Sequence, residues 1–358
     1  MTTDSPIVAL LADLLAASVV SSAQGQALRD WELADGERAR AWGITPDNVE
    51  AALEERLHWL RTLMPHHDTL ALPPVPLEAT LILYWQLWLP LALNLKQARE
   101  RQPRPLIQGI LGGQGTGKTT LSSILRHILG AMGYGTLGFS IDDLYKTYVD
   151  RQQLRQADPR LRWRGPPGTH DVDLGIAVLD HLRQAQPGDA VSIPRFDKSL
   201  HGGEGDRIAP EVVQGIDIVL FEGWFLGARP LPSGQLEQQL AQAPEPIRTA
   251  ADRQFAREMN HALAQYLPLW DRLDRLMILY PQDYRISKVW RQQAEQQMKA
   301  QGKPGMDAAK IEEFVEYFWR ALHPTLFIEP LKQERQYTQL VVEINLDRTP
   351  RAIYAPPE

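Results

Sequence analysis

The chain has 358 residues, of which 44% are hydrophobic and 23% charged, as in an ordinary globular protein. Its formal net charge is −6, so no overall positive charge is available to hold a nucleic acid backbone, and an anionic small molecule would need a local cluster of arginine and lysine. The sequence contains no cysteine, which excludes disulfides, thiolate nucleophiles and cysteine-ligated metals and agrees with a cytoplasmic location.

The first hundred residues are predicted to be helical. Their first apolar stretch, 7–20, is interrupted by Asp13 and lacks the basic residues that precede a signal peptide's apolar core, so we expect an amphipathic or buried helix. A second apolar segment, 81–95, is short for a membrane span and contains Gln86 and Pro90. We expect a buried, kinked helix there, and no membrane partner.

Residues 96–105 are polar and contain prolines, which predicts a boundary between a helical region, 1–100, and a second domain, 101–358. Beyond this link, short apolar runs alternate with helical stretches. The predicted strands are 106–111, 137–141, 190–193, 216–221, 276–280 and 340–344. Such alternation is typical of an α/β fold with a mostly parallel sheet between two layers of helices. Ligands bind beyond the carboxyl ends of strands in these folds, so we expect the reactive side chains directly after the strands.

The first predicted strand runs into a glycine-rich loop. Its residues are Gly112, Gly113, Gln114, Gly115, Thr116, Gly117, Lys118 and Thr119, with Thr120 opening a predicted helix. This satisfies G-x-x-x-x-G-K-[ST] in strand–loop–helix context, which makes a chance glycine-rich turn a weak alternative. The backbone N–H groups would wrap phosphates, while Lys118 reaches the β- and γ-phosphates and the Thr119 hydroxyl ligates Mg²⁺. The sequence therefore predicts a P-loop nucleoside triphosphate hydrolase-type fold that uses ATP and Mg²⁺.

Carboxylates follow two further predicted strands. Asp142 and Asp143 come at the end of the second. Because successive side chains on a strand point to opposite sides, we expect only one of them to face the nucleotide, where it could accept a proton from a substrate hydroxyl and help orient Mg²⁺. Glu222 follows the strand 216–221 and is expected near Mg²⁺. Capping of the next segment is the alternative for all three acids.

Basic residues gather between positions 160 and 207. They are Arg162, Arg164, His170, Arg195, Lys198, His201 and Arg207, separated by the turn-forming runs 165–168 and 201–205. This cluster predicts a pocket for an anionic acceptor, such as a carboxylate held by arginine in bidentate geometry. A solvated surface position is the alternative for any one of these residues.

Residues 284–322 are predicted to form a helical lid over ATP. Lys288 and Arg291 share one helix face and could offset charge that develops on the phosphates, although an exposed charged helix is the alternative. The run His66, His67 and Asp68 is not expected to bind a metal, because no third ligand follows at helical spacing.

Four runs give a more specific indication. SIDDLYKTYVDRQQL, RGPPGTHDVDL, IPRFDKSLHGGEGDR and VLFEGWFLGARP, in this order and spacing, resemble the D-glycerate 3-kinase family, which is related to uridine kinase, phosphoribulokinase and bacterial pantothenate kinase. The resemblance covers about residues 105–345. It implies transfer of the γ-phosphoryl group of ATP to the 3-hydroxyl of D-glycerate, as in photorespiration, by a cytoplasmic enzyme without the transit peptide of plant relatives.

The resemblance also implies roles for individual residues. Lys118 would be catalytic, Asp142 would act as the base, Glu222 would lie near Mg²⁺, and Arg291 would belong to the lid. Arg164, His170, Asp171, Lys198 and Arg207 match motif positions near the acceptor. Two alternatives stay open: a kinase of the same fold that acts on a nucleoside, pantothenate or a sugar phosphate, and a protein that uses ATP as a switch for binding. The oligomeric state is not predicted.

Overall fold

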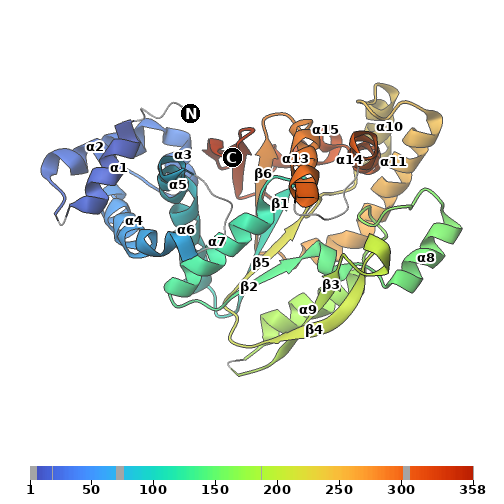
Figure 1. Ribbon diagram of the computed structural model, residues 1–358, viewed down its shortest axis with the longest axis horizontal. Helices are drawn as coiled ribbons and strands as arrows, with labels where there is room; N and C mark the ends of the chain where they lie inside the picture. The colour runs from blue at the N-terminus through green and yellow to red at the C-terminus, as the bar shows by residue number, and fades with distance from the viewer. Residues whose placement is uncertain (1–5, 18, 70–75, 187, 301–306, 358) are drawn as a thin grey trace.

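The computed structural model describes residues 6–17, 19–69, 76–186, 188–300 and 307–357. A six-stranded sheet in the order β2-β5-β1-β6-β7-β8 runs through the second part of the chain (Figure 1). Its strands are β1 (Leu106–Gly112), β2 (Thr136–Ser140), β5 (Ile218–Gly223), β6 (Arg275–Pro281), β7 (Leu340–Ile344) and β8 (Pro350–Tyr354). All neighbours pair in parallel except β7 and β8. The predicted α/β fold with a mostly parallel sheet is confirmed.

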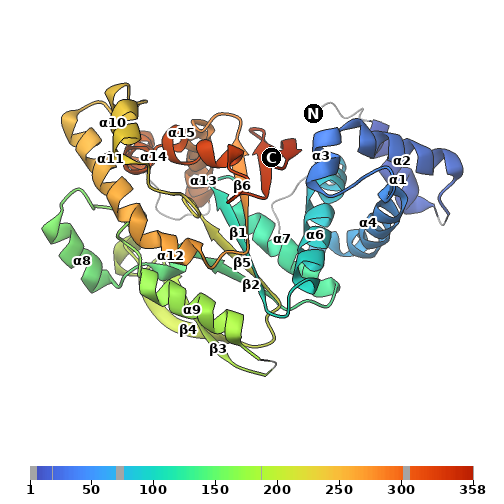
Figure 2. The same ribbon diagram turned by 180° about the vertical axis from the view of Figure 1, so that it is seen from behind.

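Helices cover both faces of this sheet, because the central strands are apolar on both sides. On β1, Ile110 joins one hydrophobic core, whereas Ile107 and Leu111 join the other. The first core contains α7 (Lys118–Ala131) and the helices of the first hundred residues. The second core contains the remaining covering helices. They are α9 (Val172–Gln184), α10 (Ser233–Ala241), α11 (Ala250–Leu263), α12 (Leu267–Trp270) and α14 (Ala308–Ala321). Figures 1 and 2 show these two layers from opposite sides.

Short helices fill the N-terminal region. They are α1 (Pro6–Ala16), α2 (Ser22–Ala34), α3 (Gly36–Ala41), α4 (Val49–Leu63), η1 (Met64–Thr69), α5 (Leu77–Leu83), η2 (Tyr84–Trp88) and α6 (Leu89–Glu100). The segment expected as a kinked buried helix spans the last three, and η2 is a π-helical turn. Pro90 lies just after this turn, and Leu89 N still donates to Tyr84 O across it, so the wider turn lies where the proline lacks an N–H for a regular helical bond. Among the described residues, no helix is long and apolar enough to cross a membrane.

A separate antiparallel ribbon lies beside the sheet. It consists of β3 (Val191–Asp197) and β4 (Asp206–Val213), so the prediction that 190–193 belongs to the parallel sheet is wrong. The connection between these strands holds only the short turn η4 (His201–Gly203), which is compatible with antiparallel pairing alone. β4 was not predicted, because its sequence is polar and carries Pro210, and the short edge strand β8 was missed as well.

The remaining elements surround the carboxyl ends of the strands. They are η3 (Ile141–Leu144), α8 (Tyr148–Ala157), η5 (Ala264–Tyr266), α13 (Ile286–Ala300), α15 (Pro324–Phe327) and η6 (Pro330–Gln333). Helices α13 and α14 occupy the segment predicted as a lid, with residues 301–306 between them outside the described residues.

Candidate active site

The glycine-rich loop connects β1 to α7. Gly115 and Gly117 have φ angles of +80° and +89°, which L side chains rarely adopt, and Gly112 is needed because a Cβ there would lie 2.6 Å from Thr116 Oγ1. Lys118 opens α7, followed by Thr119 and Thr120, and its Nζ donates to Gly113 O at 2.9 Å. Burial lowers the pKa of the Lys118 ammonium, while the carboxylates of Glu222 and Asp142 oppose this shift. The lysine thus lies over the loop between the two predicted acids.

Glu222 lies directly beside this loop because β5 pairs with both β1 and β2. Its register partners are Ile110 on β1 and Ser140 on β2. Glu222 Oε1 accepts a hydrogen bond from Thr119 Oγ1 at 2.7 Å. Among the described residues Glu222 Oε2 is buried without a partner. Burial raises the pKa of the Glu222 carboxyl, against the effect of Lys118.

A divalent cation fits this pair of residues. Mg²⁺ prefers hard oxygen ligands, usually one or two carboxylates besides phosphate oxygens and water. The Thr119 hydroxyl and the orphaned Glu222 Oε2 provide such oxygens at the foot of the phosphate loop. Within the described part of the chain, no group of three or more His, Asp or Glu side chains forms a metal cluster, so any cation here would need phosphate or water to complete its shell.

Asp142 lies near Lys118 and Glu222, but the alternation of side chains along a strand does not explain its position. The strand ends at Ser140, and both aspartates lie in the 3₁₀ turn η3, so the expected strand alternation does not apply. Asp142 Oδ2 accepts from Lys198 Nζ at 2.6 Å, and Oδ1 accepts from Tyr145 Oη at 2.8 Å. Burial acts to raise the pKa of Asp142, but the charge of Lys198 and the two hydrogen bonds outweigh it, and the pKa is lowered. The carboxylate is therefore ionised and oriented.

Asp143 has a structural role in the same turn. Its Oδ2 accepts from the backbone N–H of Ser140 at 3.0 Å in a capping box, so the capping alternative applies to this residue. The same oxygen accepts from Arg195 Nη1 at 3.0 Å, and Arg195 also pairs with Glu211 at 2.6 Å. The guanidinium of Arg195 thus joins the ribbon to the turn through two carboxylates, and its Nη2 also donates to Gly138 O at 3.2 Å.

The other predicted acceptor residues surround Tyr145. His170 stacks on its ring with 4.7 Å between centroids, and the Arg164 guanidinium lies 5.7 Å from the same ring. Arg207 Nε donates to Tyr145 O at 2.9 Å, and its Nη2 pairs with Asp171 Oδ2 at 2.9 Å. Together with Lys198 on Asp142, five predicted residues thus belong to one network of contacts that includes Asp142 and Tyr145.

His170 has a buried ring nitrogen without a partner among the described residues: Nε2. The Tyr266 hydroxyl accepts from Gly168 N at 3.0 Å and lies 2.8 Å from the other ring nitrogen, Nδ1. In the tautomer where Tyr266 donates to Nδ1, the hydrogen of the neutral ring is on Nε2. Burial lowers the pKa of His170 to about 3, so the ring is neutral at physiological pH.

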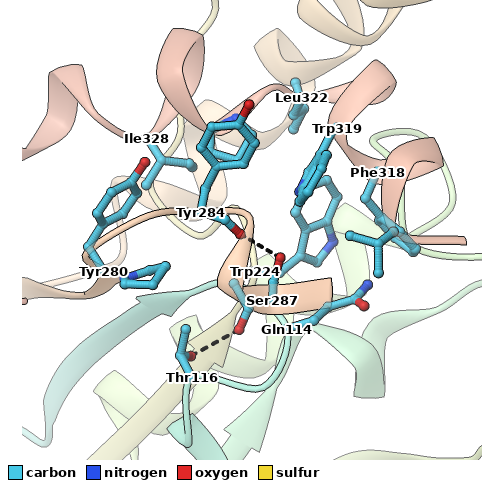
Figure 3. A pocket seen from close by; sticks show the side chains of 14 residues that line it. Gln114, Thr116, Trp224, Tyr280, Tyr284, Ser287, Phe318, Trp319, Leu322 and Ile328 are labelled. Atoms are coloured by element: carbon cyan, nitrogen blue, oxygen red, sulfur yellow. Dashed lines mark hydrogen bonds between the residues drawn. The ribbon is translucent and has the colours of Figure 1, made fainter. Parts of the chain in front are cut away.

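The segment predicted as a lid forms an apolar pocket against the phosphate loop. In Figure 3, the rings of Tyr284, Phe318 and Trp319 lie on one side of the pocket, and Gln114 and Thr116 lie at its base. Most of the lining is apolar, so the pocket can exclude water at the end of the loop where Gln114 lies.

The two lid cations are engaged with acids of the lid itself. Arg291 pairs with Glu295 on α13 and lies 5.0 Å from the Phe314 ring. Lys288 bridges α13 to α14 through Glu312 and Glu316, at 2.8 and 2.9 Å. A contact of either cation with ATP stays a prediction that requires these pairs to rearrange.

Three residues with defined places at the site were not predicted. Tyr145 and Tyr266 orient Asp142 and His170, and Arg348 reaches the phosphate loop from the turn between β7 and β8. For Tyr145, the spacing of three from Asp142 within a turn was an available signal. Tyr266 and Arg348 are distant in sequence, and only the fold brings them to the site.

Comparisons with known proteins find similar chains among kinases. No family model matches the chain. It is 31% identical over 258 residues to the chloroplastic D-glycerate 3-kinase of Arabidopsis thaliana. This match covers 69% of this chain but only 54% of that relative. It is also 34% identical over 239 residues to the uncharacterized kinase mug58 of Schizosaccharomyces pombe, covering 61% of this chain and 82% of the relative. The structure of D-glycerate 3-kinase from Cryptococcus neoformans superposes with a TM-score of 0.67 at 30% identity, over 74% of this chain and 96% of that one.

The chain belongs to the D-glycerate 3-kinase family of P-loop kinases. These relatives are named as kinases, which supports an enzyme of the phosphotransferase class. The carboxylate of Asp142 and the unpartnered oxygen of Glu222, whose charges both act on Lys118, suit an enzyme of this class. The chain spans about half the length of the Arabidopsis relative.

Proposed function

We propose that this kinase uses Mg²⁺ and ATP to phosphorylate the 3-hydroxyl of D-glycerate, giving 3-phosphoglycerate. The single observation that carries the proposal is the group around Asp142: an ionised carboxylate next to the phosphate loop, with Lys198, Arg207 and the unpartnered Nε2 of His170 nearby. A carboxylate acceptor needs such donors, and a primary hydroxyl needs a base within reach of the γ-phosphate.

The phosphate loop and its acids have distinct tasks in this proposal. The loop N–H groups and Lys118 hold the β- and γ-phosphates, while Thr119 and Glu222 hold Mg²⁺, which when bound would neutralise charge on the phosphate oxygens. Asp142 accepts the proton of the acceptor hydroxyl while the oxygen of that hydroxyl bonds to the γ-phosphorus. The bond between the γ-phosphorus and the oxygen that links it to the β-phosphate breaks, and ADP leaves with the electron pair. Catalysis then rests mainly on positioning and charge stabilisation.

The acceptor carboxylate is assigned to the donors around Tyr145. Arg164, Lys198 and Arg207 supply positive charge, and His170 supplies a neutral N–H. Asp171 holds Arg207 in place through their ion pair. We assign Arg195 to positioning, because its guanidinium already binds Asp143 and Glu211. The likeness of sequence and structure to two D-glycerate 3-kinases supports glycerate as the acceptor.

The lid is proposed to close the phosphate end of the site. Its aromatic pocket borders Gln114 and would keep water from the γ-phosphate, which limits wasteful hydrolysis. Arg291 would then turn from Glu295 toward the phosphates on closure. Lys288 would keep α13 and α14 moving as a unit through its two glutamates.

The experiment is ADP release by the purified enzyme with Mg²⁺ and ATP and a panel of acceptors: D-glycerate, L-glycerate, uridine, pantothenate, ribulose 5-phosphate and none. We expect turnover with D-glycerate well above the others, and a phosphorus NMR spectrum of the product that identifies the 3-phosphate. Turnover on a different acceptor would keep the kinase and overturn glycerate. Slow hydrolysis that no acceptor stimulates would favour the ATP-switch alternative.

A further inference from the structure

Arg348 sits in a strained turn against the phosphate loop. Its φ angle is +67°, one of two positive φ values at described residues other than glycine. Such conformations cost free energy and concentrate at functional sites. Arg348 Nε donates to Gly115 O at 2.7 Å, and its guanidinium lies 5.0 Å from the ring of Trp290, itself anchored to the turn by a 2.8 Å hydrogen bond to Leu346 O.

The guanidinium of Arg348 has no acidic partner in the part of the chain that the structure describes. Among the described residues, no carboxylate lies within ion-pairing distance of Arg348, whereas Arg285, Arg291 and Lys288 nearby in the lid are all paired. The neighbouring Asp347 accepts instead from Thr349. The two terminal nitrogens of Arg348 and the face of its plane away from Trp290 thus remain available, on a residue that is otherwise exposed.

The topology indicates which part of a nucleotide would meet this residue. Asp142 and Glu222 mark the γ-phosphate end; Asp142 lies in the turn that follows β2 and Glu222 lies on β5, both on one side of β1. Arg348 comes from the β7–β8 turn on the other side of β1. The loop N–H groups face the phosphates, so a side chain bound to the carbonyl of Gly115 lies on the outer rim, away from the β- and γ-phosphates.

We propose that Arg348 forms the base side of the nucleotide site, where the free face of its guanidinium packs against the adenine of ATP. This rests on the proposed use of ATP. Arginine suits such a place because its planar, delocalised cation stacks on aromatic faces. The contacts with Trp290 and Gly115 O hold the guanidinium in position. The positive φ of Arg348 costs free energy, and the surrounding turn stabilises it.

The test compares Mg²⁺-ADP with Mg²⁺-pyrophosphate by isothermal titration of the full chain, because pyrophosphate has no base. Arg348→Ala should weaken ADP binding about tenfold, in the range of a partly desolvated cation–π contact, and leave pyrophosphate binding unchanged. Arg348→Gly also removes the backbone strain, so it should weaken ADP equally while the melting temperature holds or rises. Arg351→Ala, an exposed arginine on β8, is the matched control and should bind ADP like the wild type.

Three outcomes of these titrations would overturn the role proposed for Arg348. Wild-type ADP affinity in both Arg348 variants would overturn the proposal. An equal loss of ADP and pyrophosphate would also overturn it, since Arg348 would then act only by holding the loop. If the wild-type enzyme binds neither ligand, the proposed use of ATP fails, and the role of Arg348 is overturned with it because it rests on that use.

Discussion

Asp142 and Asp143 are adjacent in the sequence, yet they have different partners. Sequence reasoning could place an acid at the carboxyl end of β2, because a strand followed by a helix is visible in the residue pattern. It could not derive which aspartate faces the loop, since that depends on where the strand ends. The turn begins at Ile141, and Ser140 then binds Asp143 as a cap and leaves Asp142 to Lys198 and Tyr145.

Replacing each aspartate should separate these roles. We expect Asp142→Asn to lower turnover with D-glycerate by about 10²-fold or more, the usual scale of general-base help, with little change in ADP affinity. Asp143→Asn should mainly lower the free energy of unfolding, because it weakens a cap and an ion pair to Arg195. Steady-state kinetics and denaturant unfolding of both variants check this. A mild Asp142→Asn with an inactive, stable Asp143→Asn would reverse the assignment.

His170 should make stability depend on pH. Burial lowers its pKa from the ordinary 6.5 to about 3 in the folded protein. The unfolded chain therefore binds the proton more readily, and the stabilisation is complete above pH 6.5 and lost as the pH falls toward 3. Within that window the loss is about 1.4 kcal/mol per pH unit.

The measurement is the free energy of unfolding by urea at several pH values. We expect His170→Asn to reduce the slope between pH 6 and 4 relative to the wild type, whatever its effect on absolute stability. Part of the slope should remain, because burial also lowers the pKa of His323, to about 4. His181→Asn, on the exposed surface of α9, is the control. An unchanged slope in His170→Asn would contradict the buried neutral ring.

At the scale of elements, the lid and the phosphate loop meet at one close contact. A Cβ on Gly115 would lie 2.5 Å from Trp290 Cβ, so the loop and α13 approach as nearly as a glycine allows. The sequence predicted the loop and the helix separately, from a motif and from charge spacing. Their contact could not be predicted, because no periodic pattern relates residues 115 and 290 across the sheet.

Gly115→Ala should therefore disturb both elements. Its φ of +80° makes alanine strained, and the clash with Trp290 forces α13 away from the loop. We expect a loss of at least 1–3 kcal/mol of stability, roughly the cost of one strained residue, and a clear rise in the KM for ATP. Gly133→Ala is the matched control, since Gly133 has a φ of +89° but nothing within 4 Å of an added Cβ.

The comparison of the two alanine variants separates strain from contact. Gly133→Ala should lose stability through backbone strain alone and keep the KM for ATP. If Gly115→Ala is no worse than Gly133→Ala in both stability and KM, then α13 yields freely and the contact does not position the loop.

At the scale of the molecule, the first hundred residues share their core with the kinase fold. Sequence reasoning predicted these residues as helical and predicted a boundary near 96–105 from composition. In the structure, Trp88 and Leu91 belong to the same hydrophobic core as Leu125 of α7 and Leu220 of β5. Polar contacts add to this, with Arg99 bound to Asp217 at 3.0 Å and Arg275 to Asn94 at 2.6 Å. Composition marks a change of secondary structure at the link, but it cannot tell whether the two sides bury surface against each other.

A chain that begins at residue 101 should consequently fail to fold stably. Its α7 would lose its packing against α6 and η2, and apolar side chains of the shared core that are now buried would become exposed there. Full exposure of each such side chain costs about 1.5–3 kcal/mol, so a few of them rival the 5–15 kcal/mol that typically separates folded from unfolded proteins. We expect the truncated chain to aggregate or to lose its cooperative thermal transition, whereas the full chain unfolds in one step seen equally by near- and far-ultraviolet circular dichroism. Because α7 begins at Lys118, a truncated chain that stays folded with full turnover would show instead that α7 and the phosphate loop hold their places without the N-terminal helices.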